Sequence, residues 1–403
     1  MNVIITNMIG LLMVAILVAI TARRLRLPYT AGLVVTGIAL AVSRIHTGVF
    51  LTHDVIFDVL LPPLLFEAGI NIHWPQLRQD AVPILVLAVL GTLIAAAFVT
   101  AGMVYGLGWP LQPALLFGVL IAATDPVAVI AMFKDNNVTG RLRLLVESES
   151  LANDGVAAVL FSLVLAWTQT GGTATAAGVS TALLMTVGGG VLCGLVFAAL
   201  AIAVSGRTED HLVESTLTLI VAYGAFLTAE HFHGSGVIAT VTAGLLMGNL
   251  GILADGEDGR ISPRGRTFTL ELWDFLAFIA NSLVFLLIGL TMAEIPLSQL
   301  GAKSLCVILI LVLLGRALTI YPLCAAFLRS AWRVPLPLQH VLWWGGLRGA
   351  LGLALALSLD PALPMRNQIL VATFCVVIFS VVVQGFTMPL LLRATVGDAK
   401  HRR

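Results

Sequence analysis

The feature that most constrains this chain is a series of apolar runs, several of them longer than the roughly 18 residues needed to cross a bilayer. Of the 403 residues, 59% are hydrophobic and only 11% are charged, whereas roughly 25% are charged in a typical soluble protein. Lipid offers no hydrogen bonds to the backbone, so apolar runs of this length fold as membrane-spanning helices. The sequence therefore predicts an all-α, polytopic membrane protein.

Windows of about 19 residues predict about thirteen membrane-spanning segments. They cover residues 5–21, 29–43, 55–71, 83–106, 112–132, 149–168, 180–204, 213–230, 236–250, 270–292, 304–328, 339–358 and 367–392. The longest connection, 251–269, is Gly-rich and charged, and a short tail, 393–403, follows the last span. We therefore expect the membrane domain, residues 1–392, to carry the function.

The basic residues sort to one side of this predicted topology. Of the 22 Lys and Arg side chains, only Arg44, Lys303 and Arg366 fall in loops on the other side. Because loops rich in Lys and Arg remain in the cytoplasm, we expect a multi-pass protein of the cell (inner) membrane with its N-terminus outside and its C-terminus cytoplasmic. Arg316 and Arg348 lie inside spans and need partners there.

Net charge and cysteine spacing exclude two other classes of protein. The formal net charge is +1, which gives no basic surface for a nucleic-acid partner. The four cysteines lie in apolar runs without a CxxC motif, so we interpret them as buried small hydrophobes. No cofactor is expected.

The fifth span contains Thr124-Asp125-Pro126. Proline removes a backbone donor and disfavours helical geometry at the residue before it, so we expect the helix to break here. Broken helices in membranes line cavities and build ion sites in transporters. A plain proline kink with a capping Asp125 is the alternative interpretation.

The sixth span begins with ESLAND, residues 149–154. Ser150 and Asp154 are four residues apart and so share one face of a helix, where a hydroxyl and a carboxylate suit a hard cation. Desolvation favours the protonated form of a partly buried carboxylate, so such a group can exchange a proton for a metal ion near neutral pH. A solvated helix start with serine as its cap is the competing interpretation.

The twelfth span contains GGLRG, residues 345–349. Its glycines weaken the helix, so we predict a second break, and Arg348 needs a partner, for which Glu149 is the best candidate. Spans five and twelve run in opposite directions, which is typical of an inverted repeat with units at spans four to six and eleven to thirteen. Crossed discontinuous helices are the expected product.

Three further charged residues lie within spans. Glu67 in PPLLFEAGINI stands near a span end, where ion ligation and snorkelling to the interface are equally good interpretations. We interpret Arg316 as a structural cation that pairs with another helix or with carbonyls. Asp274 receives no assignment.

Together, PPLLFEAGINI, TDP, ESLAND and GGLRG, in this order, resemble the monovalent cation:proton antiporters of the NhaP/NHE type. The resemblance implies a sodium/proton antiporter that is a secondary transporter and not an enzyme. It also implies an NhaA/NhaP-like fold and a homodimer in membrane lipid. Spans 1–3 and 7–10 would form, in part, the dimerisation or scaffold unit, and spans 4–6 and 11–13 an ion-translocating core that moves like an elevator.

The resemblance assigns the essential titrating and cation-binding aspartate to Asp154. The other members of the implied Na⁺, Li⁺ and H⁺ site are Ser150, Thr124, Glu67, Asp125 and Asn153, and the implied structural ion pair is Glu149 with Arg348. Electrogenic relatives carry a second aspartate before the essential one, whereas this chain has Asn153. One titrating carboxylate that binds either Na⁺ or H⁺ implies electroneutral exchange of one cation for one proton.

Two alternatives remain from the residues themselves. A K⁺/H⁺ antiporter or a cation channel on the same scaffold is possible, because oxygen ligands on a broken helix do not fix the ionic radius. An intramembrane aspartyl protease would use Asp125 and Asp154 as a dyad. That class is disfavoured because the sequence has no GxGD motif.

Overall fold

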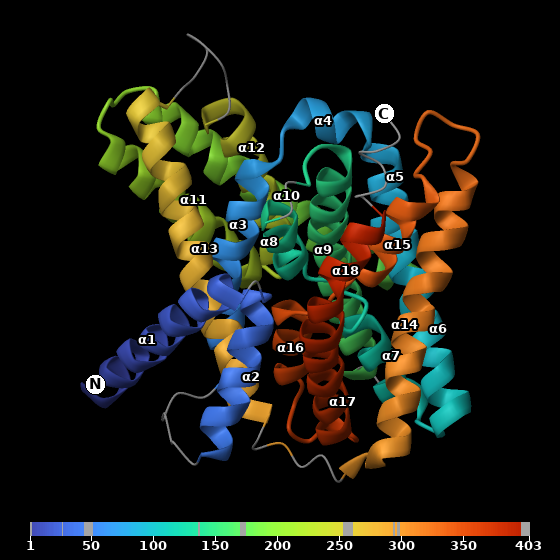
Figure 1. Cartoon of the computed structure of the whole chain (residues 1–403). Coiled ribbons are helices and arrows are strands. Elements are labelled where there is room, and N and C mark those ends of the chain that lie inside the picture. Colours follow the sequence, from blue (N-terminus) through green and yellow to red (C-terminus); the bar gives the residue numbers. More distant parts are fainter. Residues whose placement is uncertain are drawn as a thin grey trace. The chain divides into compact units, whose positions relative to one another are not determined.

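A computed structural model of the chain describes residues 2–25, 27–43, 51–135, 138–169, 175–252, 261–292, 295 and 299–395, and all regular elements within these ranges are helical (Figure 1). The all-α prediction is confirmed. The predicted tail beyond residue 395 and residues 253–260 of the long connection lie outside the described residues. The chain divides into two compact units: the first contains Met1–Ile56, Val82–Asn153 and Asn281–Arg403, and the second contains Phe57–Ala81 and Asp154–Ala280.

The first unit contains both chain ends and the two segments predicted to break. Its helices are α1 (Asn2–Leu25), α2 (Tyr29–Val42), α5 (Ala81–Leu85), η2 (Val86–Leu90), α6 (Gly91–Leu107), α7 (Leu111–Leu120), α8 (Val127–Asp135), α14 (Gly301–Ala326), α15 (Leu336–Trp344), α16 (Ala350–Leu357), α17 (Arg366–Phe379), η6 (Ser380–Gln384) and α18 (Gly385–Thr395). The π-helical segments η2 and η6 are continuous with the helices beside them.

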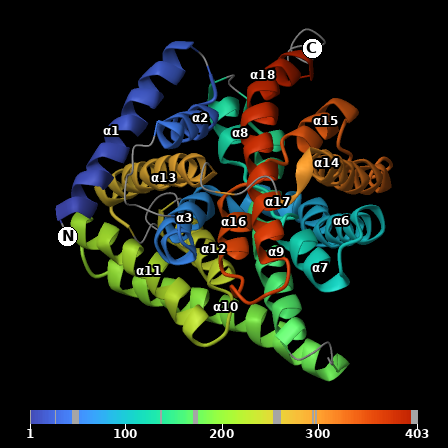
Figure 2. The same ribbon diagram turned by 90° about the horizontal axis from the view of Figure 1, so that it is seen from below.

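Within this unit α6 packs against both α7 and α14 (Figure 2). The close approach of α6 and α7 depends on small residues. A methyl group at Gly118 of α7 would overlap the Thr100 hydroxyl and the Ala96 carbonyl of α6. Thr100 in turn donates to the Ala96 carbonyl, at 2.7 Å, and so satisfies its own hydroxyl inside the bundle.

The second unit contains η1 (Val55–Leu60, from Phe57 onward), α3 (Leu61–Asn71), α4 (Trp74–Gln79), α10 (Ala176–Ser205), α11 (His211–His231), α12 (Gly236–Leu246) and η3 (Met247–Ile252). Helix α12 packs against α3, α10 and α11. The core of the unit surrounds Trp273, whose ring centroid lies 4.5 Å from that of Phe66 and whose indole N–H donates to Thr218 at 2.8 Å.

Two long helices pass from one unit into the other along the chain. Helix α9 (Arg141–Gln169) begins in the first unit, and α13 (Pro263–Met292) ends there. Both begin earlier than the predicted spans, which start at 149 and 270. Their first turns carry charged residues, and a hydropathy window discards such turns although the backbone is already helical.

Each predicted span coincides with one helix or with two or three consecutive helical segments. Among the described residues, eight helices are long and apolar enough to cross a membrane by length and composition: Thr6–Leu25, Ala81–Leu107, Arg141–Thr168, Ala177–Ser205, His211–His231, Pro263–Met292, Gly301–Ala326 and Arg366–Thr395. The chain is thus a multi-pass membrane protein. The total of thirteen crossings and the division into core and scaffold stay predictions.

We expect Gly289→Ala to lower the melting temperature of the purified protein. A methyl group at Gly289 would overlap backbone atoms of Val34 and Gly37 on α2, and such overpacking costs about 1–3 kcal/mol. The matched control is Gly188→Ala in the middle of α10, where an added methyl meets open space and should leave stability equal or higher. Thermal unfolding in detergent checks both, and equal melting temperatures for the two variants would contradict the close approach.

Candidate ion-binding site

The fifth predicted span is broken as expected, because α7 ends at Leu120 and α8 begins at Val127. Residues 121–126 between them leave the helix, and Pro126 supplies no backbone N–H to continue it. The Asp125 carboxylate instead accepts a hydrogen bond from the Val127 amide at 2.9 Å and so caps the second half-helix. The predicted break and the capping role of Asp125 therefore occur together.

The second predicted break is also present, because α15 ends at Trp344 and α16 begins at Ala350. The two interruptions meet within the first unit, where the Asp125 amide donates to the Leu347 carbonyl at 2.8 Å. Gly349 must lack a side chain, since a methyl group there would overlap the Asp125 carboxylate. The expected crossing of discontinuous helices is thus built from direct backbone contact.

Asp125 lies at the N-termini of two half-helices. Besides the Val127 amide of α8, its carboxylate receives a hydrogen bond from the backbone of Ala350 in α16. Helix N-termini carry partial positive charge from unpaired amides. One carboxylate therefore offsets the positive ends of both half-helices at the crossing.

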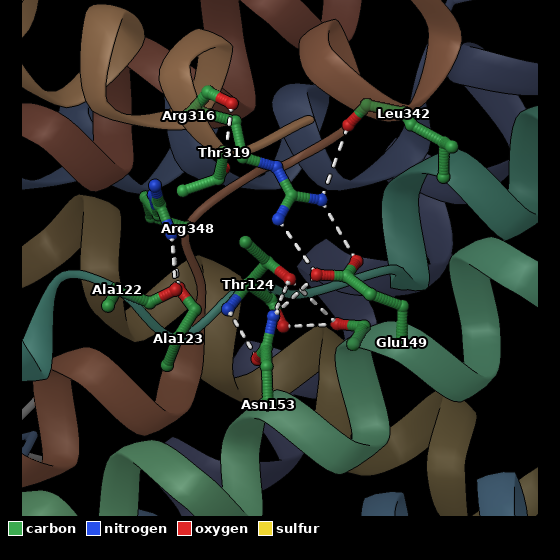
Figure 3. Close-up of polar contacts among 10 residues, drawn as sticks. Ala122, Ala123, Thr124, Glu149, Asn153, Arg316, Thr319, Leu342 and Arg348 are labelled. Atoms are coloured by element: carbon green, nitrogen blue, oxygen red, sulfur yellow. Dashed lines mark hydrogen bonds and ion pairs between the residues drawn. The ribbon is translucent and has the colours of Figure 1, made fainter. Parts of the chain in front are cut away.

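Arg348 binds carbonyl groups just beyond the C-terminal end of α7. Its Nη1 donates to the carbonyls of Ala122 and Ala123, at 2.7 and 3.0 Å, beyond the end of α7. Figure 3 shows its side chain pointing toward this segment. A guanidinium at a helix C-terminus satisfies carbonyls that lack helical partners and complements their partial negative charge.

A buried polar cluster joins the first break to α9 (Figure 3). The Thr124 amide donates to Asn153 Oδ1 at 3.1 Å, and Asn153 Nδ2 donates to Thr124 Oγ1 at 2.7 Å. Ser150 Oγ donates to the Thr124 carbonyl, so the 3.2 Å contact between the two hydroxyls has Thr124 as its donor. Thr124, Ser150 and Asn153 thus form a closed set of hydrogen bonds.

The cluster offers oxygen atoms that suit a hard cation. The Thr124 carbonyl and the Thr124 and Ser150 hydroxyls lie together, and both residues are at most 3% exposed. Thr124 and Ser150 border a narrow cavity that is also lined by Pro126, Glu149 and Gly345. Neutral oxygens of this kind bind alkali and alkaline-earth cations, and a carboxylate adds the charge.

The predicted carboxylate, Asp154, lies on α9 four residues after Ser150, and so one turn along the same face. It is partly buried. Glu67 on α3 is half-buried, and its Oε1 accepts from Asn71 Nδ2 at 2.8 Å. Asp154 and Glu67 belong to the second unit, and ligation by either residue stays a prediction.

The predicted ion pair between Glu149 and Arg348 was wrong. Glu149 pairs with Arg316 instead, with Oε1 2.8 Å from Nη1 and Oε2 2.9 Å from Nη2. The interpretation of Arg316 as a structural cation is correct, and Nη2 also donates to the Leu342 carbonyl at 3.3 Å. Arg348 is engaged with carbonyls of the fifth span, which removes the reason for giving it this carboxylate.

No local pattern in the sequence identifies Arg316 as the partner of Glu149. Both arginines are isolated cations in apolar spans, and helical periodicity assigns a face of α9 without identifying the neighbouring helix. The pair is linked to the polar cluster, because Asn153 Nδ2 also donates to Glu149 Oε1 at 3.2 Å. Ser380 was also missed, and its hydroxyl accepts from the Arg348 amide at 3.0 Å.

Comparisons with known proteins show which family the chain resembles. Residues 11–394 match the family described as sodium/hydrogen exchanger, transmembrane. The Na⁺/H⁺ antiporter ApNhaP of Aphanothece halophytica is 40% identical over 97% of this chain and 74% of its own length. The antiporter NhaP of Pseudomonas aeruginosa is 35% identical over 86% of this chain and 82% of its own length.

A likeness in fold accompanies the likeness in sequence. The solved structure of the sodium proton antiporter MjNhaP1 from Methanocaldococcus jannaschii, at pH 8, superposes with a TM-score of 0.76. It covers 98% of this chain and 99% of that one at 21% sequence identity. The arrangement of helices is therefore shared with a known antiporter.

Arg316→Ala should destabilise the protein strongly, because it leaves Glu149 buried and without its cation. Breaking a buried pair from one side costs about 3–5 kcal/mol, so the melting temperature in detergent should fall well below that of Lys303→Ala, which removes an exposed cation from the same helix. Adding Glu149→Gln to Arg316→Ala should restore part of the loss. If Glu149→Gln rescues Arg348→Ala and not Arg316→Ala, the pairing is wrong.

Proposed function

Because this chain belongs to the sodium/hydrogen exchanger family, we propose that Na⁺, or Li⁺, and H⁺ compete for Asp154 and are exchanged one for one. The chain is a sodium/proton antiporter, which makes it a secondary transporter and not an enzyme. The observation that carries the proposal is the buried cluster of Thr124 and Ser150 oxygens, with Asp154 one turn along α9.

We propose that a dehydrated cation binds between the Asp154 carboxylate and the oxygens of Ser150 and Thr124, with Glu67 as a further ligand. Binding would reorient the two hydroxyl hydrogens, since each hydroxyl oxygen must turn a lone pair toward the cation. When a proton occupies Asp154, the site loses its negative charge and the cation leaves. Competition at one carboxylate is therefore the exchange itself.

The surroundings of Asp154 support a one-for-one ratio. Asn153 cannot titrate, and its amide is committed to Thr124 and Glu149. The charge of Glu149 is matched by Arg316, and Asp125 is held at two helix ends. If Asp154 is the one carboxylate of the site that exchanges its proton, with Glu67 unchanged in charge, one positive charge enters as another leaves, and no net charge crosses the membrane.

The transport cycle needs access from both sides in turn. We propose that the crossing of half-helices moves as part of an ion-translocating core, in a homodimer embedded in lipid, by alternating access. We also propose that the protein lies in the cell (inner) membrane. The distribution of Lys and Arg favours an N-terminus outside and a C-terminus in the cytoplasm. In this setting the protein would serve pH homeostasis.

Asp154→Asn should abolish exchange while leaving a folded protein. The amide does not take up a proton, and it has no negative charge with which to bind a cation. The measurement is the dissipation of a pH gradient in proteoliposomes by Na⁺, Li⁺ and K⁺. Asp360→Asn is the matched control, since Asp360 is an exposed loop residue and should transport as wild type does.

Retained Na⁺-driven proton flux in Asp154→Asn would overturn the assignment of the site. If K⁺ dissipates the gradient as well as Na⁺ does, the preference for Na⁺ or Li⁺ fails. A current that persists without proton flux indicates a channel instead.

Exchange by the wild type should not respond to the membrane potential. With one cation exchanged for one proton, the cycle moves no net charge, so a potential set by K⁺ and valinomycin should change neither its rate nor its end point. The measurement is Na⁺-dependent proton flux in proteoliposomes held at positive, zero and negative potential. A flux that rises at one sign of potential and falls at the other would contradict the one-for-one ratio.

A further inference from the structure

The connection between α14 and α15 is basic and has no acidic residue near it in the sequence. Arg329 and Arg333 lie in this connection and both are exposed. The chain contains no Asp or Glu anywhere from residue 295 to residue 359. Other exposed arginines have acidic neighbours in the sequence, such as Asp80 for Arg78 and Glu209 for Arg207. The positive charge of this connection therefore has no counter-charge on its own segment.

The connection is an ordered turn. The rings of Phe327 and Trp332 pack edge to face with centroids 6.2 Å apart. Ser330 Oγ donates to the Phe327 carbonyl at 2.9 Å and accepts from the Trp332 amide at 3.2 Å. At its end, Gln339 Nε2 donates to the Val334 carbonyl at 2.8 Å. The backbone that carries Arg329 and Arg333 is therefore held in one conformation by these contacts.

A third guanidinium comes from another helix of the same unit. Arg141, the first residue of α9, donates from Nη1 to the Arg333 carbonyl at 2.9 Å and from Nη2 to the Trp332 carbonyl at 3.1 Å. This contact brings a further positive charge to the turn. We call residues 327–335 together with Arg141 the basic turn.

Exposed apolar side chains stand on either side of these charges. Leu328, just after the end of α14, is 51% exposed, and Leu336, at the start of α15, is 57% exposed. The turn links two apolar helices, so it lies where the chain leaves and re-enters the membrane. Cationic side chains beside exposed leucines are typical of a surface in contact with headgroups and the upper acyl chains.

We propose that the basic turn binds the headgroup of an anionic phospholipid. The phosphate oxygens of the lipid would accept hydrogen bonds from Arg329 and Arg333, since guanidinium groups bind phosphate in a fork geometry, while Leu328 and Leu336 contact its acyl chains. The leaflet is the one that the distribution of Lys and Arg makes cytoplasmic. This inference does not depend on the role of Asp154, because it concerns binding and not exchange.

The test measures how tightly short-chain phosphatidylglycerol binds to the purified full-length protein in detergent. The readout is the rise in melting temperature that the lipid causes as its concentration increases. Each basic side chain near an anionic surface strengthens attraction about fivefold, so Arg329→Gln with Arg333→Gln should weaken binding by roughly 30-fold. The matched control, Arg78→Gln with Arg207→Gln, removes two exposed arginines, one on α4 and one after α10, and should bind as wild type does.

Equal loss of binding in both double variants, or no loss in the first, overturns the proposal. Short-chain phosphatidylcholine and inorganic phosphate, at the same ionic strength, should produce no comparable stabilisation, and a phosphate effect equal to that of the lipid would overturn the lipid assignment. If the variant with Arg329→Gln and Arg333→Gln fails to fold, the salt dependence of lipid binding by the wild type tests the proposal instead. Its affinity for phosphatidylglycerol should fall as salt is raised, and an affinity independent of salt refutes the role of the arginines.

Discussion

The structure depends on how two interrupted helices satisfy each other's backbone inside a membrane. A break in lipid leaves amides and carbonyls that water cannot reach, and each costs several kcal/mol if it stays without a partner. Here the Asp125 amide reaches the Leu347 carbonyl, and Arg348 reaches the carbonyls of Ala122 and Ala123. Each break would leave backbone groups without partners if the other were absent. The two pairs of half-helices therefore stabilise each other.

From this crossing a continuous set of polar contacts runs to the neighbouring helices. Thr124 is held by Asn153, Asn153 also contacts Glu149, and Glu149 is paired with Arg316 on α14. Every member is buried, where a hydrogen bond is strong and an unmet polar group is costly. The fixed position of the Thr124 oxygens follows from contacts on three separate segments of the chain.

The sequence predicted the parts of this structure that depend on local chemistry. A proline after Asp125 and the glycines around Arg348 act on their own backbone, so both breaks could be located to within a few residues. The choice of Arg316 over Arg348 as the partner of Glu149 depends on which helix lies beside α9, and helical periodicity does not contain that information. The start of α9 at Arg141 was missed for a different reason. Hydropathy reports the polarity of the side chains, and the first turns of this helix are charged although their backbone is helical.

The neutral surroundings of Asp154 bear on how leakage is avoided. Asn153 carries no charge, and Glu149 and Arg316 cancel each other, so under the proposed competition the charge of the site changes with the occupant of Asp154. Under the proposed mechanism, bound Na⁺ or H⁺ would neutralise the carboxylate of Asp154, so the loaded site would enter a low-dielectric environment at a lower cost than the empty one. Empty, it would carry an uncompensated carboxylate into that environment, and the desolvation penalty rises steeply for such a group. If Asp154 binds the transported ion as proposed, the same carboxylate would thus hold the unloaded carrier on whichever side of the membrane it faces.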